Sequence, residues 1–184
     1  MQTPTRSIAM PGSAEKKQES KDAQKVMRRL AQRLKALGFE RTKPSFFTLP
    51  RELVVEFVHV HKFTFGPCFR VHFGIRVKKD EHAGANLNGP CSDSFGDPAT
   101  NRRIYSFDYT PDPESFDACA QVMFAFIESE GIKWFGAFAA PQDLLSAPET
   151  PLNTWQQDFL RQALQDPTGA ASSPATQDVL GIVE

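Results

Sequence analysis

The feature that most constrains this fold is the stretch from Glu52 to Lys78, in which two runs of alternating side chains flank a short Gly-Pro turn. Alternation with period two is typical of paired β-strands, because successive side chains of a strand point to opposite faces of the sheet. In the second run one face is apolar from Phe69 to Val77, whereas the other carries polar side chains such as Arg70 and Arg76. The sequence therefore predicts a β-hairpin whose second strand has one face in the core and one face in water.

Length and composition favour a single domain. The chain has 184 residues, of which 40% are hydrophobic, and its 16 Phe residues can fill one substantial core. No apolar run approaches the roughly 20 residues that span a bilayer, and the first residues lack the apolar segment of a signal peptide. The three cysteines are widely spaced and form no CxxC pair, which suits free thiols in a reducing compartment. We therefore expect a cytoplasmic protein with no membrane contact and no cofactor.

Charge is unevenly distributed, although the net charge is only −1. Residues 16–43 contain ten Lys or Arg and three acidic residues, a net charge of +7, and residues 44–184 carry a net charge of −8. A basic helix can bind nucleic acid, but the aromatic, Gly-rich and zinc-binding motifs that sharpen such an interpretation are absent. We expect a solvated basic face, and nucleic-acid binding through this first helix is a third hypothesis for function.

Hydrophobic periodicity separates a folded middle from two irregular ends. Residues 1–20 and 167–184 contain too few periodic apolar groups to offset the entropy of ordering them, so we expect both to be disordered. Residues 21–166 form the expected single α+β domain, which opens with an amphipathic helix from Asp22 to a cap at Gly38. Four apolar residues of the tail are an exception, since they can pack on a sheet edge: Val179, Leu180, Ile182 and Val183.

Further patterns complete the predicted sheet and its helices. Residues 45–49 predict a short strand before the hairpin, and residues 103–109 alternate as a fourth strand. Residues 112–131 and 150–164 carry helix-start signals and apolar surfaces. We therefore predict an antiparallel sheet of about four strands, in the order helix, four strands and two helices, with the helices packed on one face.

The histidines of the hairpin are candidate metal ligands. His59 and His61 share one face of the first strand, and a turn near Gly66 sets His72 opposite His59. Three imidazole nitrogens with an open fourth position can bind Zn²⁺ and activate water for hydrolysis. A structural role is the commoner case for such residues, and a slip of one residue in register moves His72 to the other face. A metal-dependent hydrolase is therefore the alternative function.

A candidate nucleophile is Cys68, near His61 or His72 in the predicted hairpin. A thiol beside an imidazole can form a reactive pair. A cysteine next to a turn also serves as a small apolar side chain, and this role is the more frequent one.

The long segment from Lys79 to Arg102 is the candidate binding site for a partner protein. It is rich in Gly, Asn, Asp, Ser and Pro and is longer than an ordinary connection, and loops on a rigid scaffold commonly carry binding. The face of the hairpin that we expect in water adjoins this segment. The predicted partner contacts are Arg70, Arg76, Asp80, Glu81, Asp93 and Asp97.

The motifs between residues 26 and 77 resemble those of a bacterial family catalogued as domain of unknown function 4304. They comprise a helix end at Gly38-Phe39, a short strand with Phe46-Phe47, a strand that ends near His61, and the strand segment His72-Phe73-Gly74. The family tends to carry amides at the two histidine positions, and residues 103–145 match only loosely. The resemblance implies a small α+β bacterial protein without an established activity.

Small cytoplasmic proteins of such families sometimes neutralise toxins as immunity proteins, and this analogy suggests the partner. Because no motif in the chain indicates a reaction, we expect a protein-binding module rather than an enzyme. The candidate partner is a toxin or another protein encoded nearby.

Overall fold

A computed structural model describes residues 9–97, 99–100, 102–166 and 171–183. Its main sheet has five antiparallel strands in the order β1-β2-β3-β4-β7. The strands are β1 (Glu40–Lys43), β2 (Phe46–Pro50), β3 (Val54–Lys62), β4 (Cys68–Val77) and β7 (Phe107–Asp108). The predicted α+β class and the central hairpin are confirmed, and the single strand expected before the hairpin is a strand pair, β1 and β2.

The first helix, α1 (Ala14–Leu34), begins earlier than the predicted start at Asp22. Ser13 caps it, because its side chain accepts a hydrogen bond from the backbone N–H of Lys16. A short 3₁₀ turn (η1, Lys35–Leu37) follows, and Gly38 ends it with a φ of 83°, as its position in the sequence predicts. The expectation of disorder over residues 1–20 is therefore wrong for residues 14–20, which belong to α1. It failed because the cap signal at Ser13 lies well before the apolar stripe that marks the helix.

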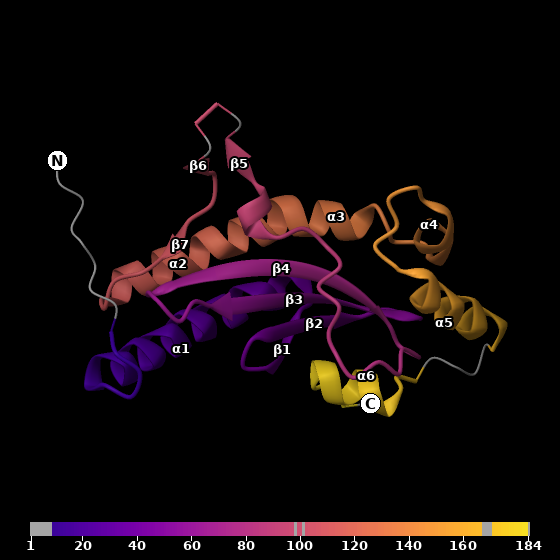
Figure 1. Cartoon of the computed structure of the whole chain (residues 1–184), viewed down its shortest axis with the longest axis horizontal. Helices are drawn as coiled ribbons and strands as arrows, with labels where there is room; N and C mark the ends of the chain where they lie inside the picture. The colour runs from indigo at the N-terminus through magenta and orange to yellow at the C-terminus, as the bar shows by residue number, and fades with distance from the viewer. Residues whose placement is uncertain (1–8, 98, 101, 167–170, 184) are drawn as a thin grey trace.

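A layer of helices covers one face of the sheet. In Figure 1, α1 and α2 (Pro113–Phe126) run along the sheet together, and α2 continues through the π-helical turn η3 (Ile127–Gly131) into α3 (Ile132–Gly136). Alternate residues of β4 from Phe69 to Val77 point into this core, as predicted. Phe73 lies at its centre, stacked on the ring of Phe126 at 5.2 Å between centroids. This face holds most of the buried apolar side chains.

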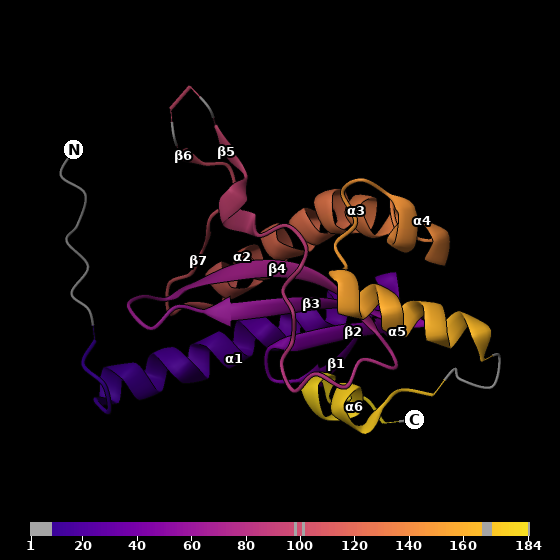
Figure 2. The same cartoon turned by 45° about the vertical axis from the view of Figure 1, so that its right-hand side comes forward.

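The opposite face of the sheet is partly covered by the C-terminal helix α6 (Pro174–Leu180). Leu180 and Ile182 pack there against Val55 and Phe57 of β3 in a second apolar cluster. The expectation of a disordered tail is therefore wrong for the part of residues 167–184 that the structure describes. Leu180 and Ile182 do pack on the sheet, but on its face against β3 and not on an edge, as the alternative for the tail expected. The helices α4 (Pro141–Ser146) and α5 (Thr154–Gln165) lie at one end of the sheet (Figure 2).

The long segment after β4 returns along the edge of that strand. Gly89 donates a backbone hydrogen bond to Phe73, and Phe73 donates one to Pro90, both 3.1 Å long. The side-chain amide of Asn88 bonds both backbone groups of Ile75 at 2.9 Å. These bonds satisfy an edge that would otherwise be open to pairing with another chain. The segment is therefore held against β4 between residues 88 and 92, although its composition gives no sign of this attachment.

After a short 3₁₀ turn, η2 (Ser92–Ser94), the segment forms a hairpin of its own. β5 (Gly96–Asp97) pairs with β6 (Arg102–Arg103) as a separate two-stranded sheet. The predicted strand over residues 103–109 is thus divided between β6 and β7. None of the helices in the described ranges combines the length and the apolar character that crossing a membrane requires.

Candidate functional site

The register of the hairpin brings polar side chains together on the part of the second sheet face that α6 leaves uncovered. His59 of β3 lies opposite His72 of β4, as the position of the turn predicts, and His61 lies opposite Arg70. Cys91 lies on the other side of His72 and pairs with it as an isolated antiparallel bridge. We call His59, His61, Arg70, His72 and Cys91 the open half-face. It is the candidate functional site on the body of the protein.

The three histidines of the open half-face do not converge on one point. The ring centroids of His59 and His61 are 6.4 Å apart, and those of His59 and His72 are 6.1 Å apart. In the described part of the chain, no group of three or more His, Cys, Asp or Glu side chains is placed to hold a metal ion. The fourth histidine, His82, stacks on Trp155 at 5.3 Å. The predicted zinc-binding arrangement of His59, His61 and His72 thus lacks its geometry.

Burial determines the protonation of the two inner histidines. Desolvation, together with the charges of His72 and His61, lowers the pKa of His59 from 6.5 to about 4. The Nδ1 atom of His59 is buried and has no hydrogen-bond partner among the described residues. Desolvation also lowers the pKa of His72, with a smaller contribution from Arg70, while Asp93 raises it. Both imidazoles are therefore neutral near pH 7.

One thiol of the chain lies against an imidazole. The Sγ atom of Cys91 is 3.7 Å from Nε2 of His72, and both side chains are partly exposed. The sequence predicts such a pairing for Cys68 and gives no signal for Cys91, since the Cys91 contact exists only because the long segment returns along β4. Cys119, by contrast, is buried and donates a 3.4 Å hydrogen bond to the carbonyl of Phe107. Burial raises the pKa of the Cys119 thiol to about 12.

Arg70 connects the open half-face to the β5–β6 hairpin. Its guanidinium lies 4.8 Å from the centre of the Phe63 ring and 2.5 Å from the carboxylate of Asp93. The same carboxylate is 3.3 Å from Arg103 at the base of the hairpin. Asp97 accepts hydrogen bonds from the N–H of Ala99 and the hydroxyl of Thr100, and these bonds lower its pKa. Two predicted partner contacts, Asp93 and Asp97, thus also hold the hairpin in shape.

Two other predicted partner contacts are buried. Arg76 is only 2% exposed and Asp80 is fully buried, so the expectation that Arg76 lies on a face in water is wrong. The long segment and α6 cover this part of the sheet, and the guanidinium of Arg76 lies 3.5 Å from the Asp80 carboxylate. Neither side chain can contact a partner from this position, whereas Glu81 is exposed.

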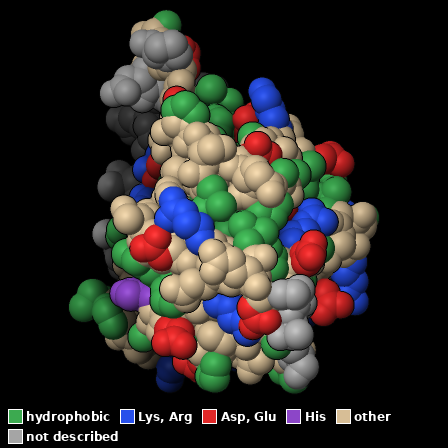
Figure 3. Space-filling model, turned by 90° about the vertical axis from the view of Figure 1, so that its right-hand side faces the viewer, with side chains coloured by type: hydrophobic (Ala, Val, Ile, Leu, Met, Phe, Trp, Pro, Cys, Tyr) green, Lys and Arg blue, Asp and Glu red, His purple; other side chains and the backbone are tan. Residues whose placement is uncertain are grey.

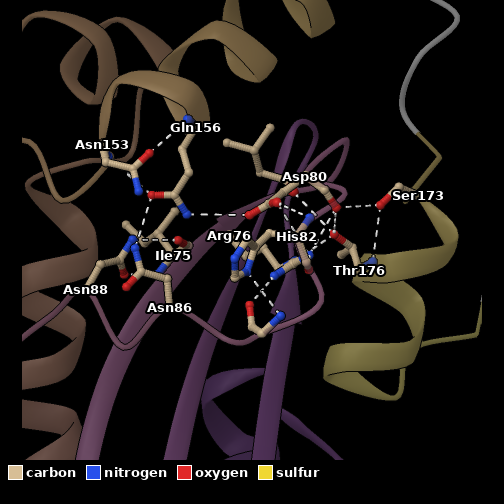
Figure 4. A network of polar contacts seen from close by, with 12 residues as sticks. Ile75, Arg76, Asp80, His82, Asn86, Asn88, Asn153, Gln156, Ser173 and Thr176 are labelled. Carbon is tan, nitrogen blue, oxygen red and sulfur yellow. Dashed lines mark hydrogen bonds and ion pairs between the residues drawn. The ribbon is translucent and has the colours of Figure 1, made fainter.

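Figure 4 shows the polar network that surrounds Arg76. Its guanidinium donates hydrogen bonds to the hydroxyl of Thr176 on α6 and to three backbone carbonyls of residues 80–84. Ser173 donates to the carbonyl of Asp80 at 2.6 Å, and the amide of Gln156 on α5 is 3.5 Å from the Asp80 carboxylate. The network joins β4, the long segment, α5 and α6. The network is a structural clamp, because the charges of Arg76 and Asp80 pair with each other and their hydrogen bonds are made within the fold.

The tail residues of this clamp were missed by sequence reasoning, although the signals of a helix are present. Ser173-Pro174 is a cap followed by proline at the first helical position, and Gly181 ends the helix with a φ of 70°. A helix of 7 residues has too short an apolar pattern to stand out from its surroundings.

The β5–β6 hairpin projects from the body of the protein, as Figures 1 and 2 both show. Ile104, directly after β6, is 60% exposed, although it donates a backbone hydrogen bond to Phe95. Phe65, in the turn between β3 and β4, is 61% exposed, and its ring centroid lies 5.1 Å from that of Phe63. Large apolar side chains are thus presented to solvent beside the open half-face and at the base of the hairpin.

A second surface lies at the end of the molecule where α4 and α5 are found. Figure 3 views this end and shows hydrophobic side chains gathered near its centre, between groups of both charges. Trp155 of α5 is partly exposed there and stacks on His82, and the edge of its ring contacts Phe159. The contact with His82 ties α5 to the long segment, so part of this apolar surface serves packing.

The basic charge of α1 is partly neutralised within the fold. Arg33 makes two hydrogen bonds, of 2.8 and 2.9 Å, to the carboxylate of Asp117 on α2, and Lys25 pairs with Asp22. The third hypothesis, nucleic-acid binding through this helix, gains no specific geometric support from these contacts.

Comparisons with known proteins return no relative. No protein-family model matches the chain, and neither a curated protein nor a solved structure does so. The resemblance to domain of unknown function 4304 therefore stays a prediction. The chemistry of the candidate site rests on its own geometry.

Proposed function

We propose that this protein is a protein-binding module that acts as an immunity protein against a toxin encoded beside its gene. The observation that carries the proposal is the β5–β6 hairpin, which projects from the body and is held at its base by ion pairs. A projecting hairpin on a fixed base presents the same shape before and after binding, which reduces the entropy lost on association. Such an element is better suited to binding a partner than to catalysing a reaction.

The base of the hairpin is tied to the body of the protein by ion pairs. Asp93 bridges Arg70 on β4 and Arg103 on β6, so the hairpin and the open half-face are linked through one carboxylate. The exposed side chain of Ile104 supplies apolar area next to this charged bridge. A buried apolar contact with a polar rim is the usual arrangement of an energetic centre in an interface.

Arg76 and Asp80 are buried and are therefore not among the proposed contacts with the partner. The proposed direct contacts are Arg70, Arg103 and Ile104, with Glu81 on the long segment. Asp93 and Asp97 contribute by shaping the hairpin. Reversing their charge would disturb the base of the hairpin as well as the encounter with a partner. A variant of either residue therefore cannot distinguish an effect on binding from an effect on structure.

The test is a pull-down and a co-expression survival assay with the product of the adjacent gene. We expect the wild-type protein to bind that product and to protect cells against the growth arrest it causes. Ile104→Asp should weaken binding by about tenfold or more, because it places a charge at the apolar contact. Val183→Asp is the matched control, since Val183 is exposed and lies after α6 rather than in the hairpin.

Two results would remove the proposal. One is the absence of binding and of protection by the wild-type protein. The other is equal loss of binding in the Ile104→Asp and Val183→Asp variants, which would indicate a general effect on folding or another contact surface.

A further inference from the structure

We propose that Cys91 is a reactive thiol, activated by His72, that undergoes exchange with low-molecular-weight disulfides. The pair is the Cys91 Sγ and His72 Nε2 contact of 3.7 Å on the open half-face. This chemistry goes beyond protein binding and does not depend on the proposed partner.

The backbone fixes the position of the two groups. Cys91 and His72 are bridge partners across the edge of β4, so their side chains emerge on the same face of the sheet. The residues on each side of Cys91 are also bonded to β4. The carbonyl of Pro90 accepts a 3.1 Å hydrogen bond from the N–H of Phe73, and the hydroxyl of Ser92 accepts a 3.2 Å hydrogen bond from the N–H of Val71. The thiol and the imidazole are therefore held together by the strand edge, with little freedom to separate.

Access and protonation favour reaction at this thiol. Cys91 is partly exposed, so a small disulfide can approach its sulfur. His72 is neutral near pH 7, because burial lowers its pKa, and a neutral imidazole can accept the thiol proton. The charged and titratable groups near this pair are Arg70 on β4, Asp93 after Cys91, and His61 on β3. A base within contact distance of a thiol is the arrangement of activated cysteine nucleophiles.

The proposed step conserves atoms and electrons. The proton of Cys91 passes to Nε2 of His72 as Sγ attacks one sulfur of a disulfide RSSR. The S–S bond of RSSR breaks, and the leaving thiolate RS⁻ takes the proton from the imidazolium. The products are the mixed disulfide of Cys91 and one RSH, so the cysteine is oxidised and the added disulfide is reduced. A second thiol reverses the reaction by the same route.

The test compares the three cysteines of one chain. Reduced full-length protein is treated with oxidised glutathione at pH 7, and the rate of modification at each cysteine is followed by mass spectrometry of peptides. We expect Cys91 to react at least about tenfold faster than Cys68, and Cys119 to remain unmodified because it is buried. His72→Gln should lower the rate at Cys91 by about tenfold or more and leave the rate at Cys68 unchanged.

Matched variants keep the test decisive. His82→Gln changes a histidine outside the open half-face, which stacks on Trp155, and we expect it to leave the rate at Cys91 unchanged. Modification of Cys119 reports unfolding, and if His72→Gln exposes Cys119, His72→Asn replaces it. Equal rates at Cys91 and Cys68 in the wild-type protein would overturn the proposal. An undiminished rate at Cys91 in a folded His72 variant would do so as well.

Discussion

The Nε atom of Arg76 donates a 2.7 Å hydrogen bond to the hydroxyl of Thr176, a residue 100 positions later in the chain. This bond joins the end of β4 to α6. Asp80 completes the arrangement, since its carboxylate lies 3.5 Å from the same guanidinium and its carbonyl accepts bonds from Ser173 and Thr176. How much of the second sheet face stays uncovered therefore depends on contacts between residues that are distant in sequence.

The clamp predicts a large cost for removing Arg76. Arg76→Ala should lower the free energy of unfolding by about 3–5 kcal/mol, because Asp80 would remain buried without its counter-charge. Chemical denaturation measures the change. Arg161→Ala is the control, since Arg161 forms an exposed pair with Asp158 and should cost less than about 0.5 kcal/mol. Similar losses in both variants would contradict the role of Arg76 as a buried clamp.

The packing of α6 predicts that the tail contributes to stability. Leu180→Ala should cost about 2–5 kcal/mol, because Leu180 is fully buried against Val55 and Phe57. Deleting residues 171–184 should lower the thermal midpoint by several degrees. Val183→Ala serves as the control, since Val183 is 97% exposed. An unchanged midpoint after the deletion would mean that α6 does not hold its position on the sheet.

Gly74 is predicted to be intolerant of any side chain. A Cβ atom at this position would lie only 2.7 Å from Cε1 of Phe57, a fully buried ring on the neighbouring strand. We expect Gly74→Ala to cost about 1–3 kcal/mol through overpacking. Gly136→Ala is the control, because a Cβ there meets nothing within 4 Å.

A double-mutant cycle checks the cause of this cost. Phe57→Leu in the Gly74→Ala background should cost less than Phe57→Leu alone, because the smaller side chain relieves the overlap. Strict additivity of the two changes in urea denaturation would assign the cost of Gly74→Ala to another contact.

The lowered pKa of His59 predicts a dependence of stability on pH. Between pH 6.5 and about 4 the unfolded chain binds a proton at His59 that the folded protein does not bind. Stability should therefore be complete above pH 6.5 and fall as the pH decreases through this window, by at most about 1.4 kcal/mol per pH unit from this group. The lowered pKa of His72 acts in the same direction.

Denaturation at pH 7 and pH 5 measures this effect. His59→Gln should reduce the difference in stability between the two pH values, whereas His82→Gln, in the long segment, should retain it. An unreduced difference in the His59 variant would show that other groups cause the pH dependence.

The sequence by itself determined the elements whose cause is local. Period-two alternation fixed the hairpin and the core face of β4, and the short turn fixed the register that sets His59 opposite His72. Gly38 was recognised as a helix cap because its position after an amphipathic stripe is a local signal. These features follow from the backbone geometry of a few neighbouring residues, which a single sequence records directly.

Only the tertiary structure decided which polar residues face water and which are buried. Alternation placed Arg76 and His72 on the same face, yet α6 and the long segment cover Arg76 and leave His72 partly exposed beside Cys91. The contacts that make this difference join residues about 100 positions apart, and their strength depends on desolvation and on complete hydrogen bonding. Neither desolvation nor complete hydrogen bonding leaves a periodic pattern in the sequence, because both arise only when separate elements pack together.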